Sequence, residues 1–277
     1  AESRAVAQHA LTLIDVEYEE LPAVFHPRDA IAPGAPVLHE NAGREVTVVG
    51  EYRLEETRGS SVNVVGEYQR SWGKVDQGFR ESDHIFEDEY VYPRSFHYPM
   101  ENIGGCVAEF RSDRVELLAP IQHMYDAQEA IASLFGLKPE QVFIRMPYVG
   151  GGFGSKDLKV RQVIALWMAR KTGRPVYTIP SAEESMRSDA RHQMVHRVKT
   201  GVKADGTLWA QEINILADEG AYAHALGVLR FAVTGAWGAY RIPHVSAQGR
   251  SVFTNCVPAG SFRDLARTQV VWAYESH

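Results

Sequence analysis

The sequence predicts an α+β fold in which mixed sheets pack against helices, and three observations support this class. Residues 104–118 and residues 194–216 each contain two β-rich segments around a short polar turn, so each stretch predicts a hairpin. Between the hairpins, residues 128–134 carry apolar side chains at helical spacing, and Gly136 follows as a typical helix end. Antiparallel hairpins and helices together are typical of the α+β class.

The most distinctive segment is a glycine run with four glycines within five positions. It reads Val149-Gly150-Gly151-Gly152-Phe153-Gly154-Ser155-Lys156-Asp157. Residues 141–146 before it have the character of a buried strand, and residues 156–172 after it show helical spacing before a stop at Gly173. With so little side chain, the backbone can approach a bulky ligand and turn its N–H groups toward an anion. This arrangement predicts a site for a large, phosphorylated ligand.

Two familiar phosphate-binding motifs share the order strand, glycine loop, helix, and neither fits the residues. A Walker A loop needs glycine before its lysine and a hydroxyl residue after it, whereas Ser155 precedes Lys156 and Asp157 follows. A dinucleotide fingerprint that starts at Gly150 meets Ser155 where its third glycine belongs. The pattern therefore indicates neither a P-loop nor a Rossmann turn.

The loop resembles the Gly-Gly-Gly-Phe-Gly-Gly-Lys segment of molybdenum hydroxylase large subunits, the xanthine dehydrogenase and aldehyde oxidase family. Further segments are similar to motifs of that family and follow in its order. They are residues 10–24, 97–101, 119–122, 171–176, 191–192, 201–206, 218–222, 240–243 and 254–258. A series of ordered motifs along nearly the whole chain is much more specific than any one motif.

The resemblance implies a domain organisation. Residues 1–25, which have the pattern of a helix and then a strand, correspond to the C-terminal tail of an α/β hammerhead domain. Residues 26–60 are rich in proline and polar side chains and predict a linker, with a boundary near Ser61. Residues 61–277 correspond to the first molybdenum-cofactor-binding domain, incomplete at its C-terminus. The family's general base is expected beyond His277, so this piece alone is expected to be inactive.

The resemblance also implies an activity and its cofactors. The expected reaction is hydroxylation of an electron-poor carbon in an aldehyde, a purine or another N-heterocycle, with oxygen taken from water. The expected cofactor is molybdopterin with molybdenum, in bacteria often as the cytosine dinucleotide. Iron–sulfur clusters of the [2Fe-2S] type and FAD are expected in partner subunits or domains, alongside the remainder of the large subunit. No side chain of this chain is expected to ligate the metal.

The resemblance implies six cofactor-binding residues: Gln122, Gly151, Gly152, Phe153, Gly154 and Arg263. It implies three catalytic residues, Gln122, Arg263 and Asp157. Gln122 matches a glutamine that donates a hydrogen bond to an oxo group on molybdenum; the alternative is a strand-end glutamine bonded to backbone. Gly151, Gly152, Phe153 and Gly154 are expected to lay their backbone against the cofactor. A tight turn, the alternative, accounts for one or two glycines but not for four in five positions.

Asp157 and Arg263 are the expected substrate contacts. Asp157 matches a position where many relatives carry a substrate-facing glutamate, and the alternative is a carboxylate at a helix N-terminus. Arg263 matches the arginine of an Ala-Phe-Arg-Gly-Phe-Gly loop that touches substrate and cofactor, and the alternative is a surface arginine. Residues 260–269 depart from that loop because they lack both later glycines and the second aromatic residue. The added side chains restrict the backbone.

This departure leaves a second interpretation open, a degenerate paralogue or assembly subunit that keeps the fold without the chemistry. Such a protein would be free of metal, so molybdenum stoichiometry separates the two interpretations. A third interpretation is a transferase that binds a nucleotide phosphate on the glycine loop. Nucleotide titration with and without magnesium tests it, and we expect no binding.

Composition limits the remaining classes of function. The chain has 45% hydrophobic and 23% charged residues and a formal charge of −6, so nucleic acid is not an expected partner. Its apolar runs are too short to span a membrane. Cys106 and Cys256 are its only cysteines, which provide neither a disulfide framework nor an iron–sulfur site. A cytoplasmic protein without a membrane partner is expected.

Overall fold

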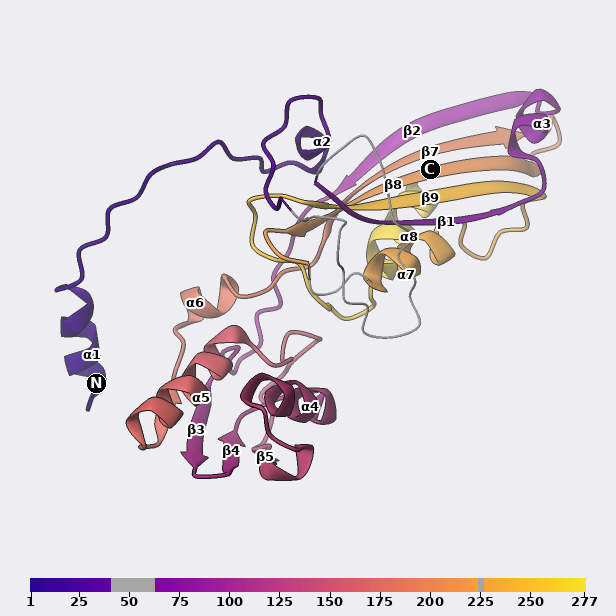
Figure 1. Ribbon diagram of the computed structural model, residues 1–277. Coiled ribbons are helices and arrows are strands. Elements are labelled where there is room, and N and C mark those ends of the chain that lie inside the picture. Colours follow the sequence, from indigo (N-terminus) through magenta and orange to yellow (C-terminus); the bar gives the residue numbers. More distant parts are fainter. Residues whose placement is uncertain (41–62, 224–226) are drawn as a thin grey trace.

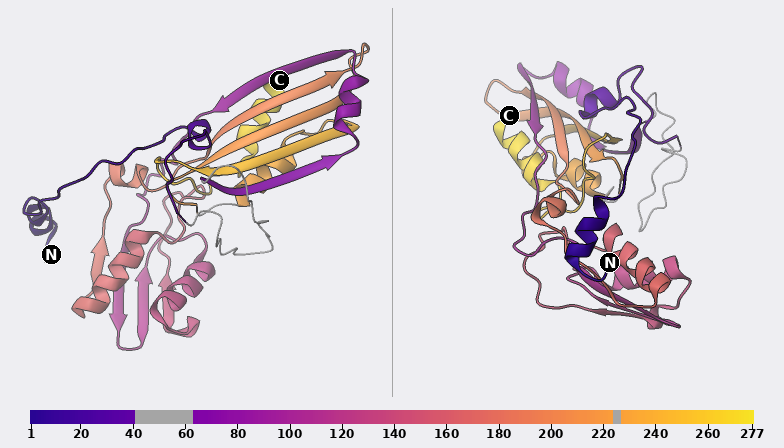
Figure 2. Two further views of the ribbon diagram at one scale, coloured as in Figure 1. Left: turned by 45° about the horizontal axis from the view of Figure 1, so that its top comes forward. Right: turned by 90° about the vertical axis from the view of Figure 1, so that its left-hand side faces the viewer.

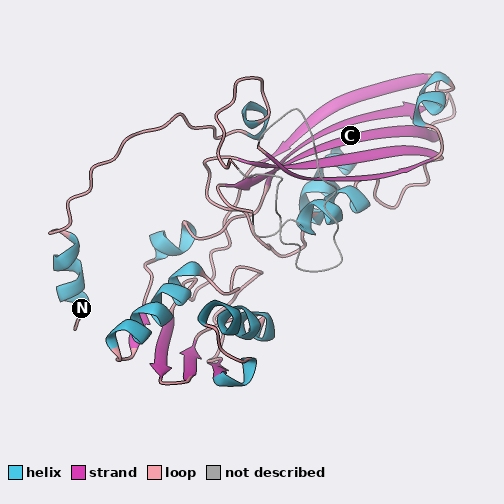
Figure 3. Cartoon of the chain, viewed as in Figure 1, coloured by secondary structure: helices cyan, strands magenta, loops and turns pink. Residues whose placement is uncertain are grey.

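Two β-sheets with helices packed against them form the structure, a computed structural model that describes residues 1–40, 63–223 and 227–277 (Figures 1 and 3). The α+β class with mixed sheets is confirmed. The boundary expected near Ser61 and the part of the expected linker from 41 to 60 lie outside the described residues.

The larger sheet has five strands and mixed pairing. In spatial order they are β1 (Val64–Trp72), β9 (His244–Phe253), β8 (Leu208–Gly220), β7 (Gln193–Val202) and β2 (His84–Tyr92). β8 and β9 pair in parallel, and the other neighbours pair antiparallel. β7 and β8 confirm the hairpin expected over residues 194–216, and their turn includes Gly206 at φ 87°, a conformation that favours glycine.

Four helices pack on this sheet or at its ends. They are α2 (Pro27–Ala30), α3 (Val75–Arg80), α7 (Gly227–Gly235) and α8 (Arg267–Ser276). Side chains alternate between faces along a strand, so Ile213 and Ile215 of β8 join the buried cluster under α7 and α8, whereas Leu216 packs with α2 on the opposite face. No helix within the described residues is long and apolar enough to cross a membrane.

The smaller sheet has four strands and packs on two helices. Its strands in spatial order are β5 (Val142–Arg145), β4 (Arg114–Leu118), β3 (Cys106–Arg111) and β6 (Val176–Thr178). The helices are α4 (Met124–Phe135) and α5 (Val160–Thr172), with η1 (Pro139–Gln141) before β5 and α6 (Ala182–Met186) after β6. Leu117, Ile131 and Leu166 are fully buried in the core between sheet and helices. This core fixes the strand ends that lead to the glycine loop.

Most local predictions for the smaller sheet are confirmed, with one shift. β3 and β4 form the expected hairpin, and β5 is the expected strand before the glycine loop. α4 ends at Gly136 (φ 67°) and α5 at Gly173 (φ 64°), both in the left-handed conformation. α5 begins at Val160 and not at Lys156. The backbone N–H and C=O of Lys156 both form hydrogen bonds with Gln122, so they are not available for hydrogen bonds within a helix.

In the sequence, the smaller sheet lies between β2 and β7 of the larger sheet, two strands that pair with each other. The chain leaves the larger sheet at the end of β2, builds the four-stranded unit, and returns at the start of β7. Figure 1 shows the larger sheet at the upper right and the smaller sheet below it, with several connecting segments of chain between them. The glycine loop and the segment around residue 263 both reach this junction, where the N–H of Arg263 donates a hydrogen bond to the carbonyl of Phe153.

The N-terminal segment departs from its prediction. Helix α1 (Arg4–Leu11) is present, but the strand expected between it and Val24 does not form. Residues 14–23 are extended and exposed, and within the described residues no other strand pairs with them (Figure 2). An extended segment becomes a strand only when a second backbone accepts its hydrogen bonds, which the apolar pattern cannot supply.

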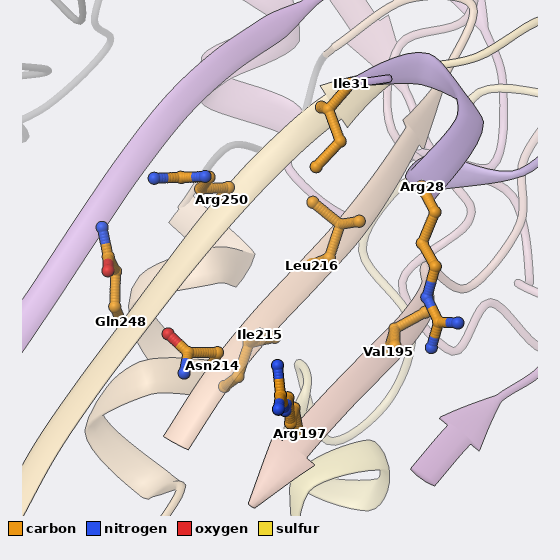
Figure 4. Close-up of a pocket in the computed structure, with 9 residues that line it drawn as sticks. All are labelled: Arg28, Ile31, Val195, Arg197, Asn214, Ile215, Leu216, Gln248 and Arg250. Carbon is orange, nitrogen blue, oxygen red and sulfur yellow. The ribbon is translucent and has the colours of Figure 1, made fainter. Parts of the chain in front are cut away.

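A hollow of about 260 Å³ lies on the face of the larger sheet that carries α2 (Figure 4). Arg28, Arg197 and Arg250 line it. Each of them pairs with a glutamate of β1 or β2. The partners are Glu89, Glu87 and Glu67, respectively. Because every guanidinium already has a carboxylate, the hollow offers no uncompensated positive charge to an anionic ligand.

His196 makes the larger sheet sensitive to acid. Its side chain is buried on the face covered by α7 and α8, and its Nε2 has no hydrogen-bond partner in the described part of the chain. Burial lowers its pKa from 6.5 to about 4. The folded protein therefore binds a proton at His196 less readily than the unfolded chain does. The contribution of neutral His196 to the free energy of unfolding is complete above pH 6.5 and is lost as pH falls toward 4.

Between pH 7 and pH 5, we expect the free energy of unfolding of His196→Leu to fall by about 2 kcal/mol less than that of the wild type. Urea unfolding of both proteins at the two pH values measures this difference. His84→Leu, at an exposed position of β2, is the control and should follow the wild-type pH dependence. Parallel pH profiles for His196→Leu and the wild type would contradict the assignment.

Candidate functional site

Parallel pairing brings Gln122 next to the glycine loop. β4 leads toward Gln122, β5 leads toward residues 150–154, and the two strands pair in parallel. The carboxyl ends of parallel strands lie at the same edge of a sheet, so the segments that follow them meet. The structure thus places Gln122 next to the glycine loop.

The side-chain amide of Gln122 has a fixed orientation. Its Oε1 accepts hydrogen bonds from the backbone N–H groups of Gly154 (3.0 Å) and Lys156 (3.2 Å). Two N–H donors require an acceptor, so the oxygen faces the loop and the Nε2 amino group points elsewhere. Within the described residues Nε2 has no partner. Backbone bonding, the alternative interpretation, therefore accounts for only one end of this amide.

The glycine loop adopts backbone conformations that favour glycine. Gly151 and Gly154 have φ values of 88° and 101°, and Phe153 between them is also left-handed at 58°. A Cβ added to Gly154 would overlap the carbonyl oxygen of Ser261. Among the described residues, the N–H groups of Gly151, Gly152 and Phe153 have no hydrogen-bond partner. Successive free N–H groups in such a turn form a concavity that suits an anion or another acceptor.

An ion pair holds the start of the loop. The carboxylate of Glu101 pairs with the fully buried ammonium of Lys156 and accepts the N–H of Gly150 at 2.9 Å. Burial alone would raise the pKa of Glu101, but the hydrogen bonds from Lys156 and Gly150 bring it below its ordinary value. The carboxylate is therefore ionised at neutral pH. Lys156 points into the protein, which agrees with the rejection of a P-loop.

Backbone contacts join the segment around Arg263 to the glycine loop. The N–H of Arg263 donates to the carbonyl of Phe153 at 2.7 Å, while the side chain of Arg263 is exposed. Phe262 lies between the imidazole of His97 and the guanidinium of Arg191, each 4.0 Å from its ring centroid. Arg191 also donates to the carbonyl of Arg263 at 2.8 Å. Stacking and cation–π contact therefore fix this segment against the loop.

The segment around Arg263 lacks two glycines of the related loop, but its backbone has left-handed conformations that favour glycine. Asp264 and Ala266, which stand where the related loop has its two later glycines, have φ values of 66° and 60°. A left-handed conformation costs most L-residues roughly 1–2 kcal/mol. The carboxylate of Asp264 accepts a hydrogen bond from the hydroxyl of Thr268 at 2.9 Å, which helps to hold the turn. The side chains have changed, but the turn is retained.

Asp157 lies ahead of the helix and not within it. α5 begins at Val160, so Asp157 lies three residues before the first residue of the helix. The Oδ1 of Asp157 instead pairs with Nδ1 of His123 at 2.7 Å, directly beside Gln122. The side chains of His123 and Asp157 are 58% and 28% exposed, so this pair opens to solvent.

Sequence reasoning named neither the supports of the site nor the partner of Asp157. Glu101, His97 and Arg191 belong to segments that resemble family motifs, but their contacts with the two loops depend on the tertiary structure. His123 gave no signal except its position next to Gln122. The geometry adds these four residues to the predicted set.

A family model described as the molybdopterin cofactor-binding domain matches residues 56–277 of this chain. The match includes Gln122, the glycine loop and Arg263. The chain belongs to the molybdopterin-binding subunits of the molybdenum hydroxylases.

Relatives of known name support this family assignment. The chain is 38% identical over its whole length to a probable xanthine dehydrogenase subunit of Bacillus subtilis, of which it covers 35%. It is 29% identical to the nicotinate dehydrogenase large molybdopterin subunit of Eubacterium barkeri, with 99% of this chain and 60% of that protein covered. The aldehyde oxidoreductase from Desulfovibrio gigas has a TM-score of 0.80 at 26% identity, with 99% of this chain and 28% of that one covered. The chain therefore spans about a third of the Bacillus subtilis relative.

A substitution at Gly154 tests how closely the glycine loop and the segment at Ser261 must approach each other. We expect Gly154→Ala to destabilise the protein by at least ~3 kcal/mol, because the left-handed strain adds to the overlap with Ser261. Gly173→Ala is the matched control, since Gly173 is also left-handed but its added Cβ meets nothing within 4 Å. It should cost only about 1 kcal/mol. Urea unfolding measures both, and equal losses would contradict the role of the contact.

Proposed function

We propose that this chain forms one wall of the cofactor site in a molybdenum hydroxylase that oxidises an aldehyde, a purine or another N-heterocycle. The fixed amide of Gln122 is the observation that carries the proposal. Its oxygen is occupied by two loop N–H groups, so its amino group is left as an oriented donor at the edge of the loop. A preorganised donor of this kind stabilises charge that develops on a neighbouring oxygen.

The residues of the loop fit a large anionic cofactor. The N–H groups of Gly151, Gly152 and Phe153, which have no partner among the described residues, provide donors for an anion. When bound, the cofactor supplies the redox chemistry that inserts oxygen from water. The protein's part is to bind and orient it, with the Gln122 amide and the exposed guanidinium of Arg263 as further donors.

Asp157 belongs to the same proposal as a substrate contact. It follows the loop, and its Oδ2 has no partner among the described residues, so it presents an acceptor to a bound molecule. The general base of the reaction lies outside this chain in the proposal, in the remainder of the large subunit. Residues 1–25 would end the preceding hammerhead domain, residues 26–60 would link, and residues 61–277 would form the first cofactor-binding domain.

The proposal includes redox partners and a cellular setting. Iron–sulfur and flavin groups in partner subunits or domains would carry electrons away from the cofactor, which itself is molybdopterin, free or as its cytosine dinucleotide. Two relatives are named as subunits of larger enzymes, which supports separate partner chains. Cys106 and Cys256 are both free thiols, a state that suits the reducing cytoplasm.

A non-catalytic paralogue that keeps the fold is the second candidate, and Asp264 is the observation that favours it. Its side chain adds a negative charge to a loop that would face an anionic cofactor. The retained left-handed turn at Asp264 and Ala266 argues for the active protein, because a segment released from function has no need to keep this strain. Molybdenum content of the purified full-length protein separates the candidates.

Gln122→Glu tests the donor. A glutamate keeps the shape of the side chain and can still accept the two loop N–H groups, but it cannot donate from the other end. We expect molybdenum content to stay at the wild-type level while the rate of substrate oxidation falls about 10²-fold. Metal analysis and steady-state kinetics of the full-length enzyme measure both.

Gln8→Glu, on the exposed helix α1, is the control for the added charge and should leave both quantities unchanged. A wild-type rate in Gln122→Glu at full molybdenum content would remove Gln122 from the proposed site. A wild-type protein without molybdenum would instead favour the non-catalytic candidate.

A further inference from the structure

Arg191 is a buried cation with which no carboxylate of the described residues forms an ion pair. The residue is 6% exposed, and its guanidinium donates hydrogen bonds to two uncharged oxygens, Oε1 of Gln269 at 3.0 Å and the carbonyl of Arg263 at 2.8 Å. Burial lowers the pKa of Arg191 from its ordinary value. A buried charge without a counter-ion does not favour folding, so Arg191 is suited to a task other than stability.

The contacts of Arg191 connect the start of β7 to the segment around Arg263. Its backbone N–H donates to the carbonyl of Ser95 at 2.7 Å, which fixes the residue just ahead of β7. Its guanidinium lies 4.0 Å from the ring centroid of Phe262 while it bonds to the carbonyl of Arg263. A planar guanidinium can make both contacts at once, whereas the compact ammonium of lysine is poorly suited to do so.

His97 contacts the same segment through Phe262 and Ser261. Its imidazole stacks on the ring of Phe262 with 4.0 Å between centroids and an interplanar angle of 23°. Its Nε2 lies 2.8 Å from the carbonyl of Ser261, and because a carbonyl only accepts, Nε2 carries the hydrogen and donates it. Residues 261–263 are therefore each held by at least one contact with Arg191 or His97.

The side chain of Arg263 depends on these contacts for its position. It is exposed, and within the described residues it has no hydrogen-bond or ion-pair partner. Its place at the glycine loop comes from its backbone N–H, which donates to the carbonyl of Phe153 at 2.7 Å. Asp264, the next residue, is left-handed at φ 66°, and strain of this kind persists only where the surroundings determine the backbone.

We propose that Arg191 is a positioning residue that holds the backbone of Arg263 against the glycine loop, so that the Arg263 guanidinium binds the anionic cofactor and slows its release. This inference rests on the proposed function. In it, Arg191 acts through Arg263 and not by contact with the cofactor.

Hydrogen exchange in the metal-free full-length protein tests the hold on Arg263 without turnover. We expect Arg191→Lys, which keeps the charge, to speed exchange of the Arg263 amide about tenfold, the effect of losing roughly one hydrogen bond. The amides of β8 report global unfolding and should accelerate less. Arg174→Lys, at an exposed arginine after α5, is the control and should change neither rate. An Arg263 amide that keeps the wild-type rate, or that accelerates only as much as the amides of β8, would overturn the proposal.

A double-mutant cycle tests whether Arg191 acts through Arg263. The measured quantity is the rate at which the full-length enzyme loses molybdenum during dialysis. We expect Arg191→Lys and Arg263→Gln each to speed this loss about tenfold. The double variant should lose molybdenum no faster than Arg263→Gln alone, because no guanidinium is left to position. Additive losses would give Arg191 a separate structural role, and the proposal would fall.

Molybdenum content of the wild type distinguishes this inference from the proposed function. A wild type that contains molybdenum, in a series of variants with additive losses, retains the proposed function and loses the inference. A wild type without molybdenum loses both.

Discussion

The close approach of two backbones, at Gly154 and at Ser261, is the constraint on which the site depends. Gly154 follows β5 of the smaller sheet, and Ser261 follows β9 of the larger one, so the contact exists only when both sheets are folded and correctly placed. The hydrogen bond from Arg263 to Phe153 reinforces the same junction. Because no side chain fits between these segments, their separation is set by the backbone alone.

Buried charge and backbone strain gather around this junction. The ammonium of Lys156 is compensated by Glu101, and the guanidinium of Arg191 spreads its donors over Gln269 and the carbonyl of Arg263. Unpaired, such groups would cost several kcal/mol, so their partners have little freedom to move. Phe153, Asp264 and Ala266 hold left-handed conformations in the same place. Strain of this kind persists where the surroundings determine the backbone, which is typical of ligand sites.

Polar groups from two neighbouring strand ends meet at the site. The loop N–H groups and the Gln122 amide provide donors, which suit an anionic cofactor. His123 and Asp157, one residue further along, pair with each other through Nδ1 and Oδ1. This meeting follows from two parallel strands, because β4 delivers residues 122–123 and β5 delivers residues 150–157 to one edge of the sheet. A short stretch of regular structure thereby brings the Gln122 amide, the loop N–H groups and the His123–Asp157 pair together.

The sequence by itself determined the fold class and both hairpins, because these depend on local periodicity. It also determined the glycine ends of α4 and α5 and the position of the glycine loop, because glycine tolerates left-handed backbone. The sequence predicted an N-terminal strand that does not form, and it placed the start of α5 at Lys156 and not at Val160. In both places, hydrogen bonding with distant residues decides the outcome. Only the tertiary structure revealed that His123 meets Asp157 and that Arg191 holds Phe262, 34 and 71 residues apart in the chain. Contacts across such separations are fixed by strand order and packing, which no local pattern of side chains encodes.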